Sequence, residues 1–174
     1  SRLVWEKNIK TLIEIYKNLK NEELLYNFII VGDGTAKADA MMEMPEAIFL
    51  CKLDHEDLSK LYASADVFLF TSISETYGNV VIEAMASGLP AVIADGGGSS
   101  SLIQHGETGF KCSPDNASEY IFHIKNIISN VDLKNKIQAN ALQYIQQLDW
   151  SELANHYFKD LNELSNQDSL AWAN

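Results

Sequence analysis

The sequence predicts an α/β domain built on a doubly wound parallel sheet. Two observations carry this prediction: short, nearly continuous apolar runs recur along the chain, and segments with helical spacing lie between them. Continuous apolar strands are typical of a parallel sheet that is covered on both faces, because right-handed crossovers place the intervening helices on those faces. A length of 174 residues fits one such domain. We interpret the fold as Rossmann-like.

The elements follow in chain order. Apolar residues between positions 12 and 19 recur at helical spacing, and a polar stretch at 20–23 ends that first helix. The apolar runs predict strands at 27–31, 47–51, 66–70, 91–94 and 109–112. Helices are expected between them at 56–63, 79–87, 99–104 and 117–129. C-terminal helices at about 133–164 carry an apolar stripe that includes Trp150 and Tyr157.

Composition and charge exclude several classes of protein. The chain is 47% hydrophobic and 21% charged, which is typical of a globular domain. Its formal net charge of −11 disfavours a nucleic-acid partner, because an extended phosphate backbone would be repelled. No apolar run approaches the roughly 20 residues of a membrane-spanning helix, and no signal peptide opens the sequence. We therefore expect a cytoplasmic protein.

Cysteine and histidine spacing predicts no metal centre. Cys51 and Cys112 lie far apart in apolar stretches, so we interpret both as reduced core residues. The histidines show no metal-ligand spacing either; they are His55, His105, His123 and His156.

The stretch 71–90 contains the strongest candidates for chemistry. Glu75 follows a predicted strand, at the sheet edge where doubly wound folds bind ligands. A helix is expected to start near Gly78 or Asn79, and its first N–H groups and dipole suit an anion such as a diphosphate. Glu83 lies about one turn into that helix, where a carboxylate can accept two hydrogen bonds from the diol of a ribose. Spacing alone leaves open that both glutamates are solvated surface carboxylates.

The segment 75–90 resembles the signature of the retaining glycosyltransferases of family four, which have two Rossmann-like domains in the GT-B arrangement. Further segments resemble that family in the same order along the chain, at 2–7, 31–34, 61–67, 91–97 and 105–110. The resemblance implies that this chain is the C-terminal, donor-binding half of such an enzyme. It also implies that the strand preceding Arg2 is missing or represented only by its end.

The resemblance also implies roles for individual residues. Arg2 and Lys7 would neutralise the diphosphate leaving group, and Glu75 would contact hydroxyls of the transferred sugar. Nucleotide binding would fall to Glu83, which holds the ribose, together with Tyr77, Gly78, Asn79, Gly32 and Leu53. The donor would be a UDP- or GDP-sugar. No Asp-x-Asp triplet is present to hold a metal-bound diphosphate, so no metal is expected there.

The expected organisation is one nucleotide-sugar-binding domain over residues 1–174, with an N-terminal acceptor domain absent from this chain. That domain would be its partner, the chain alone would be inactive, and the full-length enzyme could associate peripherally with membranes. Two alternatives stay open. One is a nucleotide- or NAD-binding domain of another sugar-nucleotide enzyme, such as an epimerase; the other is a non-catalytic interaction domain. The glycine–serine run at 96–101 could cradle phosphate or form a capped turn.

Overall fold

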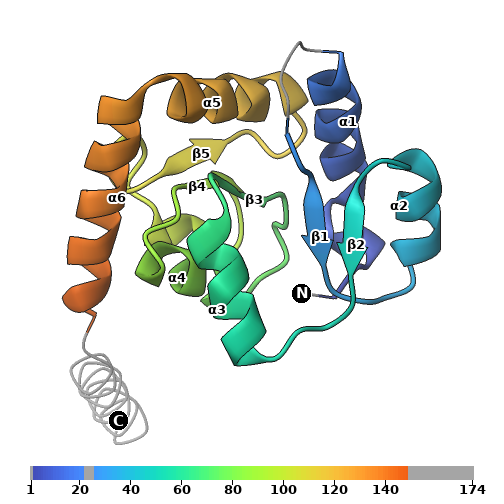
Figure 1. The fold of residues 1–174 in the computed structure, drawn as a ribbon, viewed down its shortest axis with the longest axis horizontal. Coiled ribbons are helices and arrows are strands. Elements are labelled where there is room, and N and C mark those ends of the chain that lie inside the picture. The colour runs from blue at the N-terminus through green and yellow to red at the C-terminus, as the bar shows by residue number, and fades with distance from the viewer. Residues whose placement is uncertain (1, 22–25, 149–174) are drawn as a thin grey trace, which may run out of the picture.

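A computed structural model describes residues 2–21 and 26–148, which alternate between helices and strands (Figure 1). The helices are η1 (Trp5–Lys7), α1 (Ile9–Lys20), α2 (Lys37–Glu43), α3 (His55–Ser64), α4 (Asn79–Ala86), η2 (Gly98–Leu102), α5 (Ala117–Ser129) and α6 (Val131–Gln146). The strands are β1 (Ile29–Val31), β2 (Ile48–Leu50), β3 (Phe68–Phe70), β4 (Ala91–Ala94) and β5 (Phe110–Cys112). The predicted stripe around Trp150 and Tyr157 lies outside the described residues.

All paired strands are parallel, and they form two groups. β1 pairs with β2, and β4 lies between β3 and β5. A single parallel bridge joins Arg2 to Asp33, just beyond the end of β1. The Leu3 N–H donates to the Asp33 carbonyl over 2.9 Å, so the segment that leads into η1 runs beside the carboxyl end of β1. The parallel α/β architecture that the sequence predicts is therefore present.

The position of strand β4 between two core clusters explains why its sequence is continuously apolar. Each of its four residues has no exposed surface. Val92 and Ala94 belong to a core cluster with α1 and α5, whereas Ala91 and Ile93 belong to another cluster with α4 and Ala141 of α6. Because alternate side chains point to opposite faces, both faces of this sheet are buried under helices. Figure 1 shows α5 along one side of β3–β5 and α4 on the other.

Three local features differ from the sequence prediction. Cys112 is a core residue as expected, but Cys51 is exposed, because it follows β2, whose own residues are not fully buried. Helix α2 follows β1, where no helix was expected. Its buried stripe is only Ala36, Ala40 and Met44, while Met41 and Met42 are largely exposed and obscure the helical pattern. The helix expected at 99–104 is the 3₁₀ helix η2. The remaining predicted elements form. β4 and α5 have the predicted bounds, the other strands and α4 are one or two residues shorter at an end, and α1, α3 and α6 begin one to three residues earlier than predicted.

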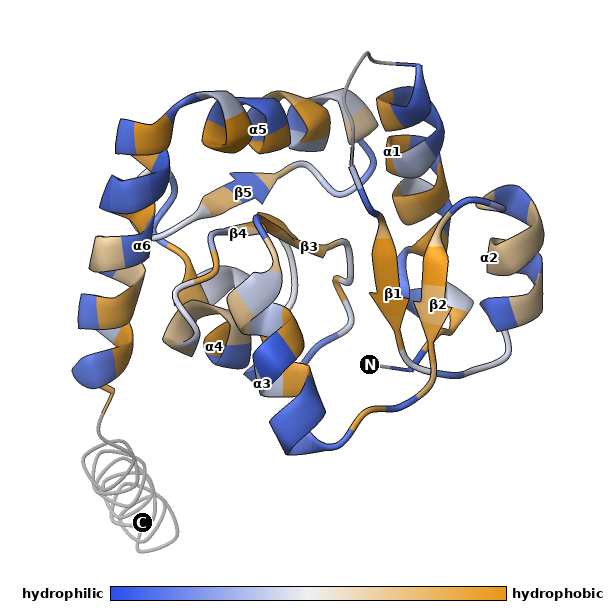
Figure 2. Ribbon diagram, in the orientation of Figure 1, coloured by the Kyte–Doolittle hydropathy of each residue, from blue (hydrophilic) through white to orange (hydrophobic). Residues whose placement is uncertain are grey.

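Hydropathy follows the layers of the fold. Figure 2 shows apolar residues along β1 and β2 and polar residues on the outer faces of α3 and α6. Over residues 2–21 and 26–148, no helix combines the length and the apolar character that crossing a bilayer requires.

Candidate functional site

Lys7 is positioned by a short turn at the start of the chain. It ends η1, and Asn8 then adopts a left-handed conformation with φ of 54°, in which its N–H donates to the Trp5 carbonyl over 3.0 Å. The Asn8 side chain donates to the Pro114 carbonyl over 2.8 Å. Thr71, at the end of β3, donates to the Lys7 carbonyl over 3.3 Å. These contacts fix the Lys7 backbone above the carboxyl end of β3.

Glu75 is positioned by close packing of two loops. The loop that follows β3 rests on the glycine turn that precedes η2, and the Gly98 N–H donates to the Glu75 carbonyl over 2.7 Å. A side chain at Gly98 would place its Cβ only 1.8 Å from the Thr76 carbonyl oxygen. Glycine at this position therefore allows the loop to hold Glu75 where it is. The glycine–serine run acts here as a support for the Glu75 loop.

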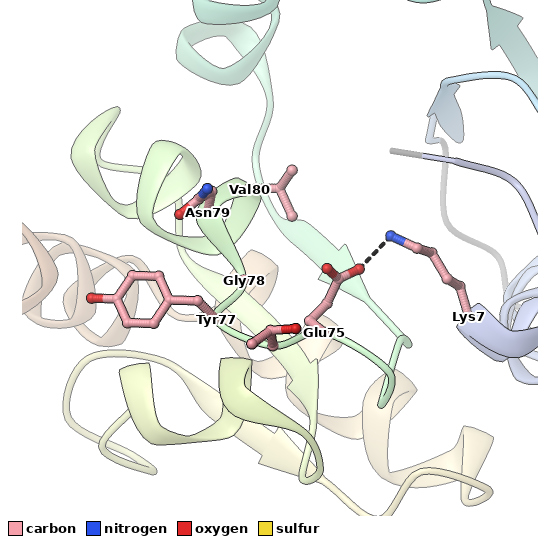
Figure 3. A pocket seen from close by; sticks show the side chains of 7 residues that line it. Lys7, Glu75, Tyr77, Gly78, Asn79 and Val80 are labelled. Carbon is pink, nitrogen blue, oxygen red and sulfur yellow. Dashed lines mark hydrogen bonds and ion pairs between the residues drawn. The ribbon is translucent and has the colours of Figure 1, made fainter.

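Lys7 and Glu75 form an ion pair, although they are 68 residues apart in the sequence. Their side chains keep 16% and 22% of their surface exposed. Ser72 also lies within 3.5 Å of the same carboxylate oxygen. Figure 3 shows the Lys7 ammonium and the Glu75 carboxylate directed at each other. Such partial burial screens the pair less than a surface pair, so the carboxylate and ammonium orient each other.

The N-terminus of α4 opens onto this ion pair. Gly78 precedes the helix with φ of 89°, and a Cβ there would lie 2.6 Å from the Cβ of Ser99. A pocket of about 280 Å³ is lined by the ion pair and the start of the helix: Lys7, Glu75, Thr76, Tyr77, Gly78, Asn79 and Val80. The Tyr77 ring points away from the ion pair (Figure 3). The first N–H groups of α4 and the Lys7 ammonium therefore lie around one hollow, which suits an anion.

A second hollow continues from the first on the side of Arg2. It measures about 470 Å³ and shares three residues with the first hollow. Its lining is Arg2, Val4, Glu6, Lys7, Ser74, Glu75 and Thr76. The structure thus brings together Arg2, Lys7 and Glu75, the three residues that the sequence suggested for catalysis.

Three candidate residues lie outside both hollows. Gly32 is buried beyond β1 and donates its N–H to the Leu50 carbonyl over 3.2 Å. Leu53 follows β2 and is half-buried. Glu83 is half-buried in α4, where the Tyr62 hydroxyl donates to its Oε2 over 3.4 Å. Burial and the neighbouring Glu83 carboxylate raise the pKa of Tyr62, so this phenol stays protonated and remains a donor.

The structure adds residues that the sequence did not single out for the site. Ser74, Thr76 and Val80 line the hollows, and Tyr62 holds Glu83. Ser74, Thr76 and Val80 lie inside the stretch 71–90, so the signal was present. Tyr62 sits in α3, and only the three-dimensional packing of α3 against α4 reveals its contact.

The donor set of the first hollow fits an anion better than a metal ion. Among the described residues that line it, Glu75 is the one carboxylate, and that carboxylate is paired with Lys7. Within residues 2–21 and 26–148, the single group of three potential metal ligands lies elsewhere, at β5 and α5.

Comparison with known proteins places this geometry in a family. The family described as "Glycosyl transferases group 1" matches residues 1–144. Sulfoquinovosyl transferase SQD2 of Arabidopsis thaliana is 34% identical over 155 residues, which cover 86% of this chain and 29% of SQD2. A GDP-mannose-dependent alpha-mannosyltransferase of Mycobacterium tuberculosis is 43% identical over 81 residues, covering 47% of this chain and 21% of that enzyme.

Solved structures agree. HepE of Anabaena, crystallised in complex with UDP, has a TM-score of 0.77 and 26% identity, with 94% of this chain and 47% of HepE covered. The C-terminal domain of the group 1 glycosyl transferase LpcC from Francisella tularensis has a TM-score of 0.74 at 21% identity, covering 83% of this chain and 80% of that one, and so shares the fold. The chain spans less than half of the curated relatives above. It belongs to the group 1 glycosyl transferases, whose solved relatives have the GT-B fold.

Proposed function

We propose that this chain binds the nucleoside-diphosphate sugar donor of a retaining glycosyltransferase. The observation that carries the proposal is the hollow at the N-terminus of α4, where the Lys7–Glu75 ion pair faces the first turn of the helix. An anionic group and a sugar hydroxyl would both find partners there. HepE, which this chain resembles along 94% of its length, was crystallised with UDP and also with UDP-glucose.

The diphosphate would lie against the start of α4 and the cationic side chains of Lys7 and Arg2. A Lys ammonium has three donors, so Lys7 can hold the Glu75 carboxylate and a phosphate oxygen together. Negative charge grows on the diphosphate as the glycosidic bond breaks. Preorganised cations and helix N–H groups stabilise that charge in the transition state, which makes a divalent metal unnecessary for this step.

Glu75 would contact hydroxyls of the transferred sugar, and the ion pair with Lys7 keeps its carboxylate directed at the same hollow. Glu83 would accept hydrogen bonds from the ribose, with Tyr62 limiting the rotation of its carboxylate. Gly32 and Leu53 follow neighbouring strands and would contact the nucleotide mainly through the backbone.

The acceptor would be presented by a partner domain across the cleft. The curated relatives are more than twice as long as the segment they share with this chain. In a two-domain transferase, the partner domain orders the acceptor and excludes water from the reacting sugar. This chain alone is therefore expected to bind the donor and to transfer no sugar. The choice of acceptor would be made by that partner domain.

Calorimetry and thermal unfolding with UDP, GDP and NAD test the proposal on the chain itself. We expect either UDP or GDP to bind and to raise the unfolding temperature. Glu83→Ala should weaken that affinity by at least about tenfold, because charge-assisted hydrogen bonds contribute about 1.5–3 kcal/mol each. Glu56→Ala, which removes another helical glutamate on α3, is the matched control and should leave affinity unchanged. Stabilisation by NAD alone would favour an oxidoreductase, and no binding by any of the three would favour an interaction domain.

Metal independence is tested in the full-length enzyme. Transfer should proceed at an undiminished rate when Mg²⁺ and Mn²⁺ are omitted. A strict requirement for either ion would contradict the role given to Lys7 and the start of α4.

A further inference from the structure

We infer that Cys112, Glu119 and His123 form a binding site for a zinc-type divalent cation, separate from the proposed donor site. The three side chains offer one ligand atom each, and these atoms all lie within 4.8 Å of one another. None of the three lines either hollow at α4. The inference does not depend on the proposed function.

The short loop between β5 and α5 brings these residues together. Cys112 is the last residue of β5, and Glu119 and His123 lie one turn apart on the same face of α5. Residues four apart on a helix are neighbours, so their ligand atoms can point the same way. Sequence spacing gave no sign of this cluster, since the Cys112 ligand comes from a strand and the other two from the following helix.

His123 supplies the second observation that points to a ligand. Its side chain is buried, with 8% exposure, yet its Nδ1 has no hydrogen-bond partner among residues 2–21 and 26–148. The ring stacks on Phe110, with centroids 4.2 Å apart, and meets His105 edge-on at 5.4 Å. Ring contacts therefore fix its orientation, while a buried ring nitrogen is left available for a ligand. Burial lowers the pKa of His123, the nearby His105 adding to this effect and Glu119 opposing it, so the imidazole is neutral and able to ligate.

Glu119 is held in place by a backbone donor. The Ser113 N–H donates to Glu119 Oε2 over 2.8 Å, which ties the carboxylate to the end of β5 next to Cys112. Metal-ligating carboxylates commonly have such an outer hydrogen bond. Glu119 is also half-buried, so a water molecule could complete the coordination from the solvent side.

The donor set selects the kind of cation. One sulfur, one imidazole nitrogen and one carboxylate oxygen suit zinc and similar borderline ions better than magnesium or calcium, which prefer oxygen ligands. Bonds from zinc to such ligands measure about 2.0–2.3 Å, which fits ligand atoms grouped this closely. Burial raises the pKa of Cys112 to about 12, so the thiol is protonated without metal. On binding, the cation displaces that proton to solvent and bonds to the thiolate.

Titration of the 174-residue chain with ZnCl₂ and with Co²⁺ tests the inference. We expect one equivalent to bind with micromolar or better affinity. Calorimetry in two buffers of different ionisation enthalpy should show proton release, and Co²⁺ should produce a thiolate-to-cobalt charge-transfer band. Cys112→Ala should abolish that band and weaken Zn²⁺ binding by at least about tenfold, as loss of even an outer partner does.

Two further variants make the result decisive. Cys51→Ala removes the exposed cysteine and is the matched control, so it should keep the band and the affinity. Glu119→Gln keeps an oxygen that can accept from the Ser113 N–H but loses the charge, so the fold should persist while Zn²⁺ affinity falls. Thermal unfolding without metal verifies that each variant is folded. The inference is overturned if the folded wild-type chain binds no Zn²⁺ below millimolar concentration, or if Cys112→Ala and Glu119→Gln bind it as the wild type does.

Discussion

The Tyr62 hydroxyl on α3 donates to the Glu83 carboxylate on α4 across 3.4 Å. Tyr62 is buried, with 9% exposure, and its ring meets Phe68 of β3 edge-on with centroids 5.8 Å apart. Its position is thus fixed by the core, whereas Glu83 is half-buried at the edge of the helix. The Tyr62 hydroxyl is therefore a rigid donor, and it restricts the Glu83 carboxylate, which we propose to bind the ribose.

Removing that hydroxyl should weaken nucleotide binding mildly. Tyr62→Phe keeps the ring packing but lets the Glu83 carboxylate rotate, so we expect affinity for UDP or GDP to fall by a few-fold. Loss of one hydrogen bond should lower the free energy of unfolding by about 0.5–1.5 kcal/mol. Calorimetry and urea denaturation measure the two effects.

Tyr16→Phe is the matched control for this prediction. Tyr16 is also buried, and its hydroxyl accepts from the Glu46 N–H over 3.1 Å, away from the proposed site. It should lose a similar amount of stability and no affinity. Equal affinities for Tyr62→Phe and the wild type would show that Tyr62 only supports the fold.

Lys7→Ala should lower turnover more than it weakens donor binding. Charge on the leaving diphosphate grows toward the transition state, so the Lys7 ammonium matters most there. In the full-length enzyme we expect kcat to fall roughly a hundredfold, as loss of one preorganised donor often does. Lys17→Ala removes a lysine from an exposed ion pair with Glu43 and should leave kcat unchanged. A rise in KM at constant kcat would mean that Lys7 contributes only to binding.

Much of the fold was predictable from sequence because β3 and β4 are apolar on both faces. Continuous apolar runs interrupted by helical spacing are the direct consequence of burying a parallel sheet on both sides. Helix α2 was missed because its buried face is narrow: Ala36, Ala40 and Met44 alone pack inward, while Met42 is 73% exposed. A hydrophobic pattern predicts a helix only when the apolar side chains are the buried ones, and in α2 the apolar side chain of Met42 points outward.

The site was predictable where its residues lie in one segment. Glu75, Gly78 and Asn79 lie within five residues of one another between β3 and the start of α4, so their closeness in the sequence already places them together. The pairing of Lys7 with Glu75 and of Tyr62 with Glu83 depends on contacts between elements far apart in the chain. No single sequence encodes such contacts as a local pattern.

The buried thiol of Cys112 should make stability depend on alkaline pH. Burial raises its pKa from 9.0 to about 12, and the carboxylates of Glu119 and Asp95 add to that shift. Between about pH 9 and 12, the unfolded chain loses a proton from this thiol that the folded chain keeps. The free energy of unfolding should therefore fall as pH rises through this window.

Cys112→Ala isolates this contribution. Urea denaturation from pH 8 to 11, in buffer with a chelator, should give a shallower decline for the variant than for the wild type. The buried phenol of Tyr62, whose pKa is also raised by burial, titrates in both proteins and cancels in the comparison. Burial also raises the pKa of Tyr120, and Cys112 adds to that rise, so the smaller shift of Tyr120 in the variant changes the slope in the same direction. Parallel curves for the two proteins would show that Cys112 is not shielded from solvent as described.

Gly78→Ala should destabilise the start of α4 more than a positive φ alone explains. Gly78 has φ of 89°, and its added Cβ would meet the Cβ of Ser99, a residue with no exposed surface, at 2.6 Å. Gly106 has a similar φ of 80°, but within the described part of the chain a Cβ there would meet nothing within 4 Å. Gly106→Ala should therefore cost only the backbone strain, about 1–2 kcal/mol. Gly78→Ala should cost more in urea denaturation and should also reduce affinity for the nucleotide, because Tyr77 and Asn79 must shift. Equal losses of stability in the two variants would mean that Ser99 moves away from the added methyl group without a cost in free energy.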